Sequence, residues 1–270
     1  MPSIHMITER KESNPGGKCI IPYQGQKMDA YIKYCEQSRL PKDHPFVPKH
    51  QPIYEAITLG LAEKLGLHTP RFGLLSNPDG NLQVTYETAN AKKDSTSPRQ
   101  PFYFVSKLCE VEEKEDLLQL TRMMAREKIY RDLLMIGDIS GKKQNFALIS
   151  EPSPHILYID VGCSFVDAVN GHLSQRHSVS NLTRDNKGKP RKGLKRDVRA
   201  ANKYLSGFGI VTNHENEWEK DLLALDEFTE SVDDLELKCI PKGRIRVGDV
   251  LSEEEITEIK SLLKLNMEQT

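Results

Sequence analysis

The order of hydrophobic and polar residues predicts strands in the first part of the chain and helices in the second. Apolar and polar residues alternate over residues 3–9 and 18–36, which is the period of a half-buried strand. Turn residues separate these segments, at Ser13-Asn14-Pro15-Gly16-Gly17 and at Gln24-Gly25-Gln26-Lys27. The pattern therefore predicts a small β-meander at the start of the chain.

The next segment adds one helix and more strands. Residues 53–65 carry apolar residues at helical spacing, and Gly66 marks the expected end of that helix. A hairpin around a turn, a polar loop and a buried strand complete this part, over residues 74–86, 90–100 and 102–108.

The second half of the chain has helical periodicity. We expect helices over residues 114–135, 195–206, 217–235 and 252–265. The last helix begins with Ser252 and has Glu255 three residues later, the pattern of a capping box. The predicted fold class is α+β, with two lobes: a β-rich N-lobe at residues 1–108 and a helical C-lobe at residues 109–270.

Composition fits such a globular protein. The 270 residues are 37% hydrophobic and 29% charged, with a formal net charge of −1, which gives no general argument for nucleic-acid or membrane binding. No apolar run approaches the roughly 18 residues of a membrane span, and the N-terminus lacks the apolar core of a signal peptide. Five cysteines stand singly, as expected for free thiols in a reducing cytoplasm.

Two residues beside apolar, strand-type runs are candidate metal ligands. Asn145 precedes Phe146-Ala147-Leu148-Ile149, and Asp160 follows Leu157-Tyr158-Ile159. If these runs are neighbouring strands, Asn145 and Asp160 can offer oxygen atoms to one hard cation. A magnesium or manganese ion that takes its other ligands from water and a nucleotide needs few protein ligands. The pattern is that of a phosphoryl-transfer site.

Other parts of such a site lie upstream. Lys33 is the central cation of the alternating segment 29–35, and Glu55 lies in the predicted helix that follows. Strand lysine, helix glutamate, loop asparagine and metal-binding aspartate then occur in the chain order of a kinase-type site. By contrast, the eight histidines show no HxxxH or HExxH spacing, and no Ser-His-Asp set can be argued, so a hydrolase is disfavoured.

The turn at Gly16 and Gly17 lies between the two opening strands. A glycine-rich turn at this place can cover nucleotide phosphates with backbone N–H groups, although an ordinary hairpin loop explains the same residues.

Three blocks of sequence resemble HipA-type serine/threonine kinases, the bacterial toxin kinases. Residues 55–74 resemble the N-lobe helix and following turn, residues 137–149 the catalytic loop, and Ile159-Asp160 the metal-binding aspartate. The resemblance covers roughly residues 28–165. Phosphatidylinositol kinases resemble Gly137-Asp138 and Asp160-Val161-Gly162 about as closely, which leaves the substrate class open.

The resemblance implies a role for each matched residue. Lys33 would hold the α- and β-phosphates of ATP, Glu55 would orient Lys33, and Asn145 with Asp160 would hold the metal. Residues 103–108 would give backbone hydrogen bonds to adenine, so that the expected nucleotide-binding residues include Phe104, Val105 and Lys107.

The catalytic loop departs from the family at the base. The position five residues before Asn145 is Ser140 instead of an aspartate, and Asp138 lies two residues earlier. Either the loop bulges at Gly141-Lys142-Lys143 and Asp138 orients the acceptor hydroxyl, with Lys142 or Lys143 neutralising developing charge, or the base is absent. Phosphoryl transfer tolerates a poor base, because positioning and charge neutralisation supply most of the catalysis.

A basic segment follows the metal-binding aspartate. Residues 184–203 hold nine basic and two acidic residues and no aromatic ones, which disfavours stacking on single-stranded nucleic acid. The segment is either a solvated surface or a site for a polyanion such as an inositol polyphosphate, a phosphoinositide or an acidic protein. Its basic residues are Arg184, Lys187, Lys189, Arg191, Lys192, Lys195, Arg196, Arg199 and Lys203.

The sequence therefore predicts an ATP- and magnesium-dependent kinase that acts on serine or threonine hydroxyls of a protein substrate. The alternatives are a pseudokinase that binds nucleotide or polyanion without catalysis, and a phosphoinositide kinase. The acidic run Ser252-Glu253-Glu254-Glu255 also resembles the C-terminal signals of effectors secreted by type IV systems. We expect a cytoplasmic protein, either in the cell that makes it or in a host cell.

Overall fold

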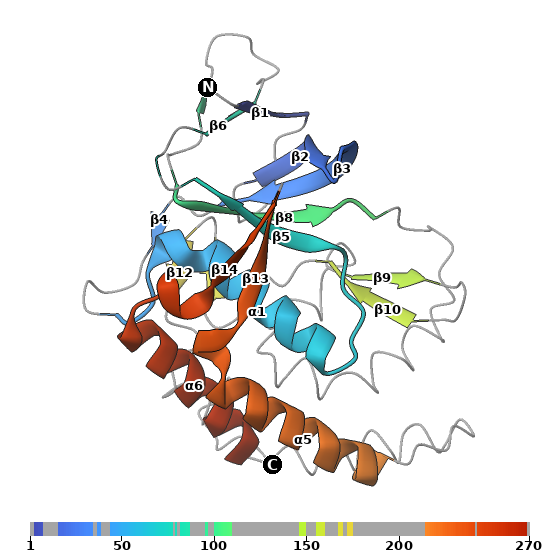
Figure 1. Ribbon diagram of the computed structural model, residues 1–270, viewed down its shortest axis with the longest axis vertical. Coiled ribbons are helices and arrows are strands. Elements are labelled where there is room, and N and C mark those ends of the chain that lie inside the picture. The colour runs from blue at the N-terminus through green and yellow to red at the C-terminus, as the bar shows by residue number, and fades with distance from the viewer. Residues whose placement is uncertain are drawn as a thin grey trace.

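The described residues form a mixed α and β structure in which one helix lies between a large sheet and a pair of helices (Figure 1). The structure is a computed structural model, and it describes residues 3–7, 16–34, 37–38, 44–77, 79, 82–86, 95–96, 100–109, 146–149, 155–159, 167–169, 172–174, 214–240 and 242–268. The helices predicted at 114–135 and 195–206 and the basic segment at 184–203 lie outside these residues.

The large sheet has nine strands in the order β14-β13-β5-β8-β3-β2-β1-β6-β7. Its strands are β1 (Ser3–Met6), β2 (Gly16–Tyr23), β3 (Gln26–Lys33), β5 (Phe72–Ser76), β6 (Gln83–Tyr86), β7 (Ser95–Thr96), β8 (Phe102–Lys107), β13 (Glu236–Ile240) and β14 (Arg244–Arg246). Smaller sheets pair β9 (Phe146–Ile149) with β10 (His155–Tyr158), and β4 (Gln37–Ser38) and β11 (Asp167–Val169) with β12 (His172–Ser174).

The predicted β-meander is confirmed. Strands β1, β2 and β3 are antiparallel neighbours, and a two-residue turn with positive φ at Gln24 and Gly25 joins β2 to β3. The buried strand expected over residues 102–108 is also present, as β8, which lies between β3 and β5.

The hairpin expected over residues 74–86 is wrong. β5 pairs with β8 and β13, whereas β6 pairs with β1 and β7 on the other side of the sheet. Asn77 explains the departure, because its side chain bonds the backbone of Leu82 and Gln100 and so directs the chain away from β5.

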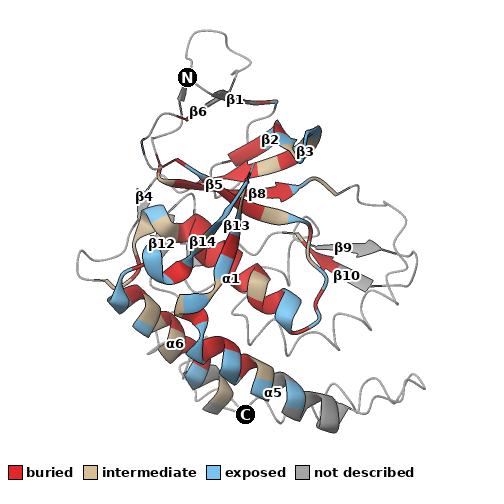
Figure 2. Cartoon of the chain, viewed as in Figure 1, coloured by how far each residue is buried: buried red, intermediate tan, exposed pale blue. Residues whose placement is uncertain are grey.

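Helix α1 (Gln51–Lys64) is buried over most of its length. Its residues from Gln51 to Leu59 are all buried, and exposure returns at Glu63 and Lys64, so that α1 is mostly red in Figure 2. A helix that is apolar all round belongs inside a core instead of on a surface. The helix ends at Gly66 as predicted, with φ of 73° and a hydrogen bond from Leu67 N–H to Ala62 O that satisfies a terminal carbonyl.

The C-terminal part of the chain covers the side of α1 that faces away from the sheet. Its elements are α5 (His214–Glu230), α6 (Glu253–Glu268) and the short 3₁₀ turns η3 (Val232–Asp234) and η4 (Val247–Asp249), while η1 (Pro48–His50) leads into α1. One apolar cluster joins α1 to both layers and contains Leu74 and Phe104 from the sheet together with Leu225, Phe228, Ile259 and Leu262 from α5 and α6.

Two expectations for the C-terminal part are corrected. The helix predicted over 217–235 runs from His214 to Glu230, and Leu235 already leads into β13. Strands β13 and β14, which the sequence placed in the helical lobe, extend the sheet of the first lobe, with β13 parallel to β5. No helix among the described residues is long and apolar enough to cross a bilayer.

Gly16 gives a direct test of the packing in this sheet. A Cβ on Gly16 would overlap the carbonyl oxygen of Ile32, whereas a Cβ on Gly60, inside α1, would come no closer than 3.8 Å to Leu235. We therefore expect Gly16→Ala to lower the free energy of unfolding by about 3 kcal/mol, since the backbone of β3 has to move.

The matched control is Gly60→Ala, which we expect to raise the free energy of unfolding by about 0.5–1 kcal/mol through helix propensity. Urea denaturation measures both variants. Equal effects of the two substitutions would show that β2 and β3 do not approach as closely as described.

Candidate functional site

The one buried ion pair between the sheet and α1, among the residues described, joins Lys33 to Glu55. Lys33 is the last residue of β3, and its ammonium group donates a hydrogen bond to Oε1 of Glu55, in the second turn of α1. The side chains are 6% and 3% exposed. Two charges removed from water to this extent depend on each other, because an isolated buried charge is very costly.

The sheet register determines where Lys33 points. Gly16, Lys33, Phe104 and Leu74 form a row across β2, β3, β8 and β5, and residues paired in this way share one face of the sheet. That face is turned toward α1, since Leu74 and Phe104 belong to the apolar cluster around this helix. The row therefore directs the Lys33 side chain toward Glu55.

Aromatic packing supports the pair from the sheet. The Nζ atom of Lys33 lies 5.2 Å from the centre of the Phe104 ring, within the range of a cation–π contact. Phe104 in turn stacks on Phe72, with ring centres 6.1 Å apart. The result is a fixed ammonium group at the end of a strand, which is the arrangement that suits an anionic ligand such as a phosphate.

The pairing that the resemblance implied for Lys33 and Glu55 is thus observed, while their role toward a nucleotide remains a prediction. Sequence spacing alone could not have found this contact, because a strand lysine and a helix glutamate 22 positions apart usually have separate surface partners.

The structure corrects the two expected glycine positions. Gly16 and Gly17 do not lie in a turn but in β2, where they pair with Lys33 and Ile32 of β3. Residues 13–15 lie outside the described part of the chain. Gly16 contributes instead by having no side chain, which lets β2 lie against the backbone beside Lys33.

The structure also contradicts the expected adenine contacts of β8. The backbones of Phe104 and Val105 lie in ladders with β3 on one side and β5 on the other, and the Lys107 N–H donates to Arg71 O at 2.7 Å. An interior strand uses its backbone groups within the sheet. Phe104 reaches Lys33 through its ring. An adenine ring would have to bind beyond Lys107.

The expected catalytic and metal residues Asp138, Asn145 and Asp160 lie outside the described residues, as does Ser140. The strands next to two of them are described. In the β9–β10 hairpin, Phe146 pairs with Tyr158, and these residues are close in sequence to Asn145 and Asp160.

The β9–β10 hairpin is attached to the turn after α1. The Tyr158 N–H donates to His68 O at 3.0 Å, and Tyr158 is buried in the apolar cluster around α1. The end of the hairpin where Phe146 meets Tyr158 therefore lies against the same structural core as the helix of Glu55.

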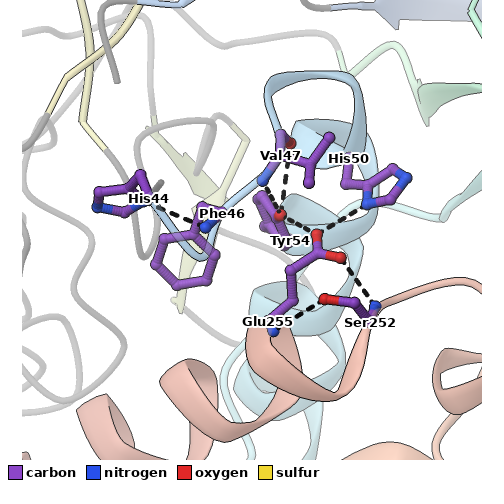
Figure 3. A network of polar contacts seen from close by, with 7 residues as sticks. All are labelled: His44, Phe46, Val47, His50, Tyr54, Ser252 and Glu255. Carbon is purple, nitrogen blue, oxygen red and sulfur yellow. Dashed lines mark hydrogen bonds and ion pairs between the residues drawn. The ribbon is translucent and has the colours of Figure 1, made fainter. Parts of the chain in front are cut away.

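A second polar cluster lies where the start of α1 meets the start of α6 (Figure 3). Glu255 of α6 is 1% exposed and accepts hydrogen bonds from the Tyr54 hydroxyl and from Nδ1 of His50, the latter at 2.7 Å. Because an ionised carboxylate can only accept, the proton of the His50 contact is carried by Nδ1. The second oxygen of Glu255 accepts from the Ser252 N–H at 2.8 Å.

The capping box expected at Ser252 and Glu255 is confirmed, since the Glu255 N–H also donates to Oγ of Ser252 at 3.2 Å. No sequence pattern indicates that Glu255 also bonds Tyr54 and His50, which lie 201 and 205 positions away. Burial alone would raise the pKa of Glu255, but the hydrogen bonds from His50, Tyr54 and the Ser252 N–H outweigh it and hold the pKa below its usual value.

No known protein-family model matches the chain, and no curated protein matches its sequence.

Removing one member of the Lys33–Glu55 pair should be more harmful than removing both. We expect Glu55→Leu to lower the free energy of unfolding by about 3–5 kcal/mol, because it leaves the Lys33 charge buried without its partner. The double variant Lys33→Met/Glu55→Leu should recover most of that loss, since apolar side chains of similar size fit an apolar cluster. Urea denaturation measures both. A double variant that is less stable than the single one would contradict the burial of this pair.

The lowered pKa of Glu255 predicts a pH dependence of stability. A carboxyl group whose pKa is lower in the folded than in the unfolded protein stabilises the fold above its ordinary value of 4.5, and this contribution disappears as the pH falls through the lowered pKa. At neutral pH the free energy of unfolding of the wild type should exceed that of Glu255→Gln by about 1–3 kcal/mol.

The difference should shrink as the pH is lowered from neutral toward about 3. Urea denaturation across this range measures it, with Glu254→Gln as the control, since Glu254 is exposed and undergoes the same change of charge. A constant difference between wild type and Glu255→Gln would show that ionisation of Glu255 does not contribute.

Proposed function

We propose that the protein is an ATP- and magnesium- or manganese-dependent phosphotransferase that acts on serine or threonine hydroxyls of a protein. The observation that carries the proposal is the buried Lys33–Glu55 pair, formed between the last residue of a strand and the helix that follows it. An ammonium group held in one direction by a carboxylate is suited to bind the phosphates of a nucleotide.

The order of the elements supports the same proposal. Strands β1, β2 and β3 form an antiparallel meander, α1 follows, and β5 and β8 complete the sheet beside β3. A lysine on the third strand and a glutamate on the next helix follow the order of parts in a protein-kinase site. Of these elements, α1 and β5 overlap the block of residues 55–74 that resembles HipA-type kinases.

The pairing of β9 with β10 supports the proposal that the two metal ligands lie close together. Asn145 directly precedes Phe146, Asp160 follows Tyr158 by two residues, and Phe146 and Tyr158 are paired. We infer that Asn145 and Asp160 hold the metal at this end of the hairpin, where each offers an oxygen ligand. The metal would neutralise charge that develops on the transferred phosphoryl group.

Two roles are assigned to the loop before β9. Asp138 would orient the acceptor hydroxyl, and Lys142 or Lys143 would neutralise charge. The adenine of the nucleotide would bind where β8 leaves the sheet, at Cys109, because the N–H groups of Lys107 and Leu108 already donate to Arg71 and Asp29.

Ser140 favours a second candidate function, a pseudokinase that binds nucleotide or polyanion without phosphoryl transfer, because it stands where the family has its aspartate. The basic residues 184–203 would then serve as the binding segment, or, in an active kinase, as the site of an activating inositol polyphosphate or of a phosphoinositide substrate. We place either protein in the cytoplasm of its own cell or, as a secreted effector, of a host cell. Glu255 is buried, so that only Glu253 and Glu254 of the acidic run are exposed at the start of α6.

Incubation of the purified protein with γ-labelled ATP, magnesium and a mixture of candidate protein substrates tests the function. We expect transfer of label to protein, and a loss of at least about a hundredfold in Asp160→Ala and Lys33→Met, because each removes a charge that binds the phosphates or the metal. Lys238→Met is the matched control, since Lys238 is an exposed lysine of β13 in the same sheet.

Thermal shifts with ATP and magnesium, with and without inositol hexakisphosphate, separate the alternatives, because a ligand stabilises the fold to which it binds. Stabilisation by ATP without transfer of label would favour the pseudokinase, and transfer to phosphoinositide alone would favour the lipid kinase. If ATP neither stabilises the protein nor serves as a donor of label, both the kinase and the pseudokinase are excluded.

A further inference from the structure

We propose that Glu255 of α6 is a positioning residue for the Lys33–Glu55 pair: it holds α1 from the C-terminal part of the chain and so regulates the site. As a statement about regulation, the inference rests on the proposed function. As a statement about the geometry of the pair, it can be tested without any nucleotide.

Tyr54 and Glu55 connect the two clusters. They are successive residues of α1, and successive residues of a helix point about 100° apart. Glu55 points to Lys33 and the sheet, whereas Tyr54 points to Glu255 and α6 (Figure 3). A rotation or shift of α1 that separates Glu55 from Lys33 therefore also moves the Tyr54 hydroxyl away from Glu255.

The carboxylate of Glu255 joins three segments. One oxygen accepts from Tyr54 of α1 and from His50 before α1, and the other accepts from the backbone at the start of α6. The Tyr54 hydroxyl in turn accepts from the Val47 N–H at 2.8 Å. Both carboxylate oxygens thus accept hydrogen bonds. The contact restricts both the rotation of the first turn of α1 and its distance from α6.

Apolar packing also joins α1 to the C-terminal elements. Apolar packing is not directional, so it holds a helix in a core but specifies its rotation less strictly than hydrogen bonds do. The polar cluster at Glu255 is therefore the contact, among those described between α6 and α1, that sets the rotation of α1. Any event that moves α6 would reach Glu55 by this route.

Chemical labelling of Lys33 measures the state of the pair directly. A lysine that is buried and bound to a carboxylate reacts slowly with an acylating reagent, and its rate can be followed by mass spectrometry. We expect Glu255→Gln to raise the labelling rate of Lys33 about tenfold. The NH₂ group of glutamine is a donor, and it would face one of the groups that now donate a hydrogen bond to the carboxylate. Glu254→Gln, the exposed neighbour with the same change of charge, should leave the rate unchanged.

Lys260 supplies the internal reference for α6. It lies in the same helix and donates to Asp233 and to the carbonyl oxygen of Glu230, so its labelling reports unfolding of α6. We expect its rate to rise by less than that of Lys33 in Glu255→Gln, because the partners of Lys260 lie in α5 and η3 and not in α1. A parallel rise at Lys33 and Lys260 would mean that Glu255 only stabilises α6, and would overturn the proposal.

Tyr54→Phe provides a second variant that removes only the hydroxyl group. It should also raise the labelling of Lys33, and combining it with Glu255→Gln should add little, because both changes break the same contact. Additive effects, or Lys33 labelling at the wild-type rate in folded Glu255→Gln, would overturn the proposal.

Phosphoryl transfer gives the separate test of regulation. We expect Glu255→Gln to reduce ATP-dependent transfer about tenfold, with no change in Glu254→Gln. If the wild type neither binds nor uses ATP, the proposed function fails while the labelling result still decides the positioning role. Faster Lys33 labelling with unchanged transfer would overturn the regulatory part.

Discussion

The buried Lys33–Glu55 pair is the contact on which the arrangement of the described structure depends. Neither charge is solvated, so each requires the other to stay in place. The pair therefore fixes the second turn of α1 against the end of β3, while the apolar row on β5 and β8 fills the space around it. Apolar side chains of similar volume often stabilise such a site at least as well, so the pair specifies the position of α1 more than it adds to stability.

The position of α1 explains why this pair is sheltered. Most helices of a globular domain present one face to water, but α1 has the sheet on one side and the C-terminal helices on the other. Glu55 and Tyr54 are consequently buried polar side chains that point about 100° apart from one helix, one to Lys33 of the sheet and the other to Glu255 of α6.

Much of this could be predicted from local patterns. Alternation gave the β-meander and β8, and helical spacing with Gly66 gave α1 and its end, because these signals lie within a few residues of one another. The capping box at Ser252 and Glu255 is equally local. The pairing of Lys33 with Glu55 required the family resemblance, since no local pattern links a strand to a helix 22 residues away.

What could not be predicted depends on contacts between distant parts of the chain. The segment Glu236–Ile240 has two buried apolar residues, Leu237 and Ile240, but nothing in its sequence indicates that it lies between β14 and β5 or that it pairs with β5 in parallel. The glycine pair was misassigned for a related reason: Gly16 is required by the closeness of Ile32, which only the folded sheet reveals. The backbone groups of Phe104 and Val105 were expected to bind a ligand because the sequence did not show that β8 has neighbours on both sides.

The return of the C-terminal segment to the sheet also bears on how the lobes fold. Without residues 214–268, the side of α1 that faces α5 and α6 would lose Leu225, Phe228, Ile259 and Leu262 as partners. Each such side chain stabilises a fold by about 1.5–3 kcal/mol when fully buried, so several of them together are comparable with the 5–15 kcal/mol that typically separate folded from unfolded domains. Residues 1–108 therefore do not complete their own core, and the segment that completes it is the one that carries Glu255. The stability of the large sheet with α1 and the orientation of α1 consequently depend on the same part of the chain.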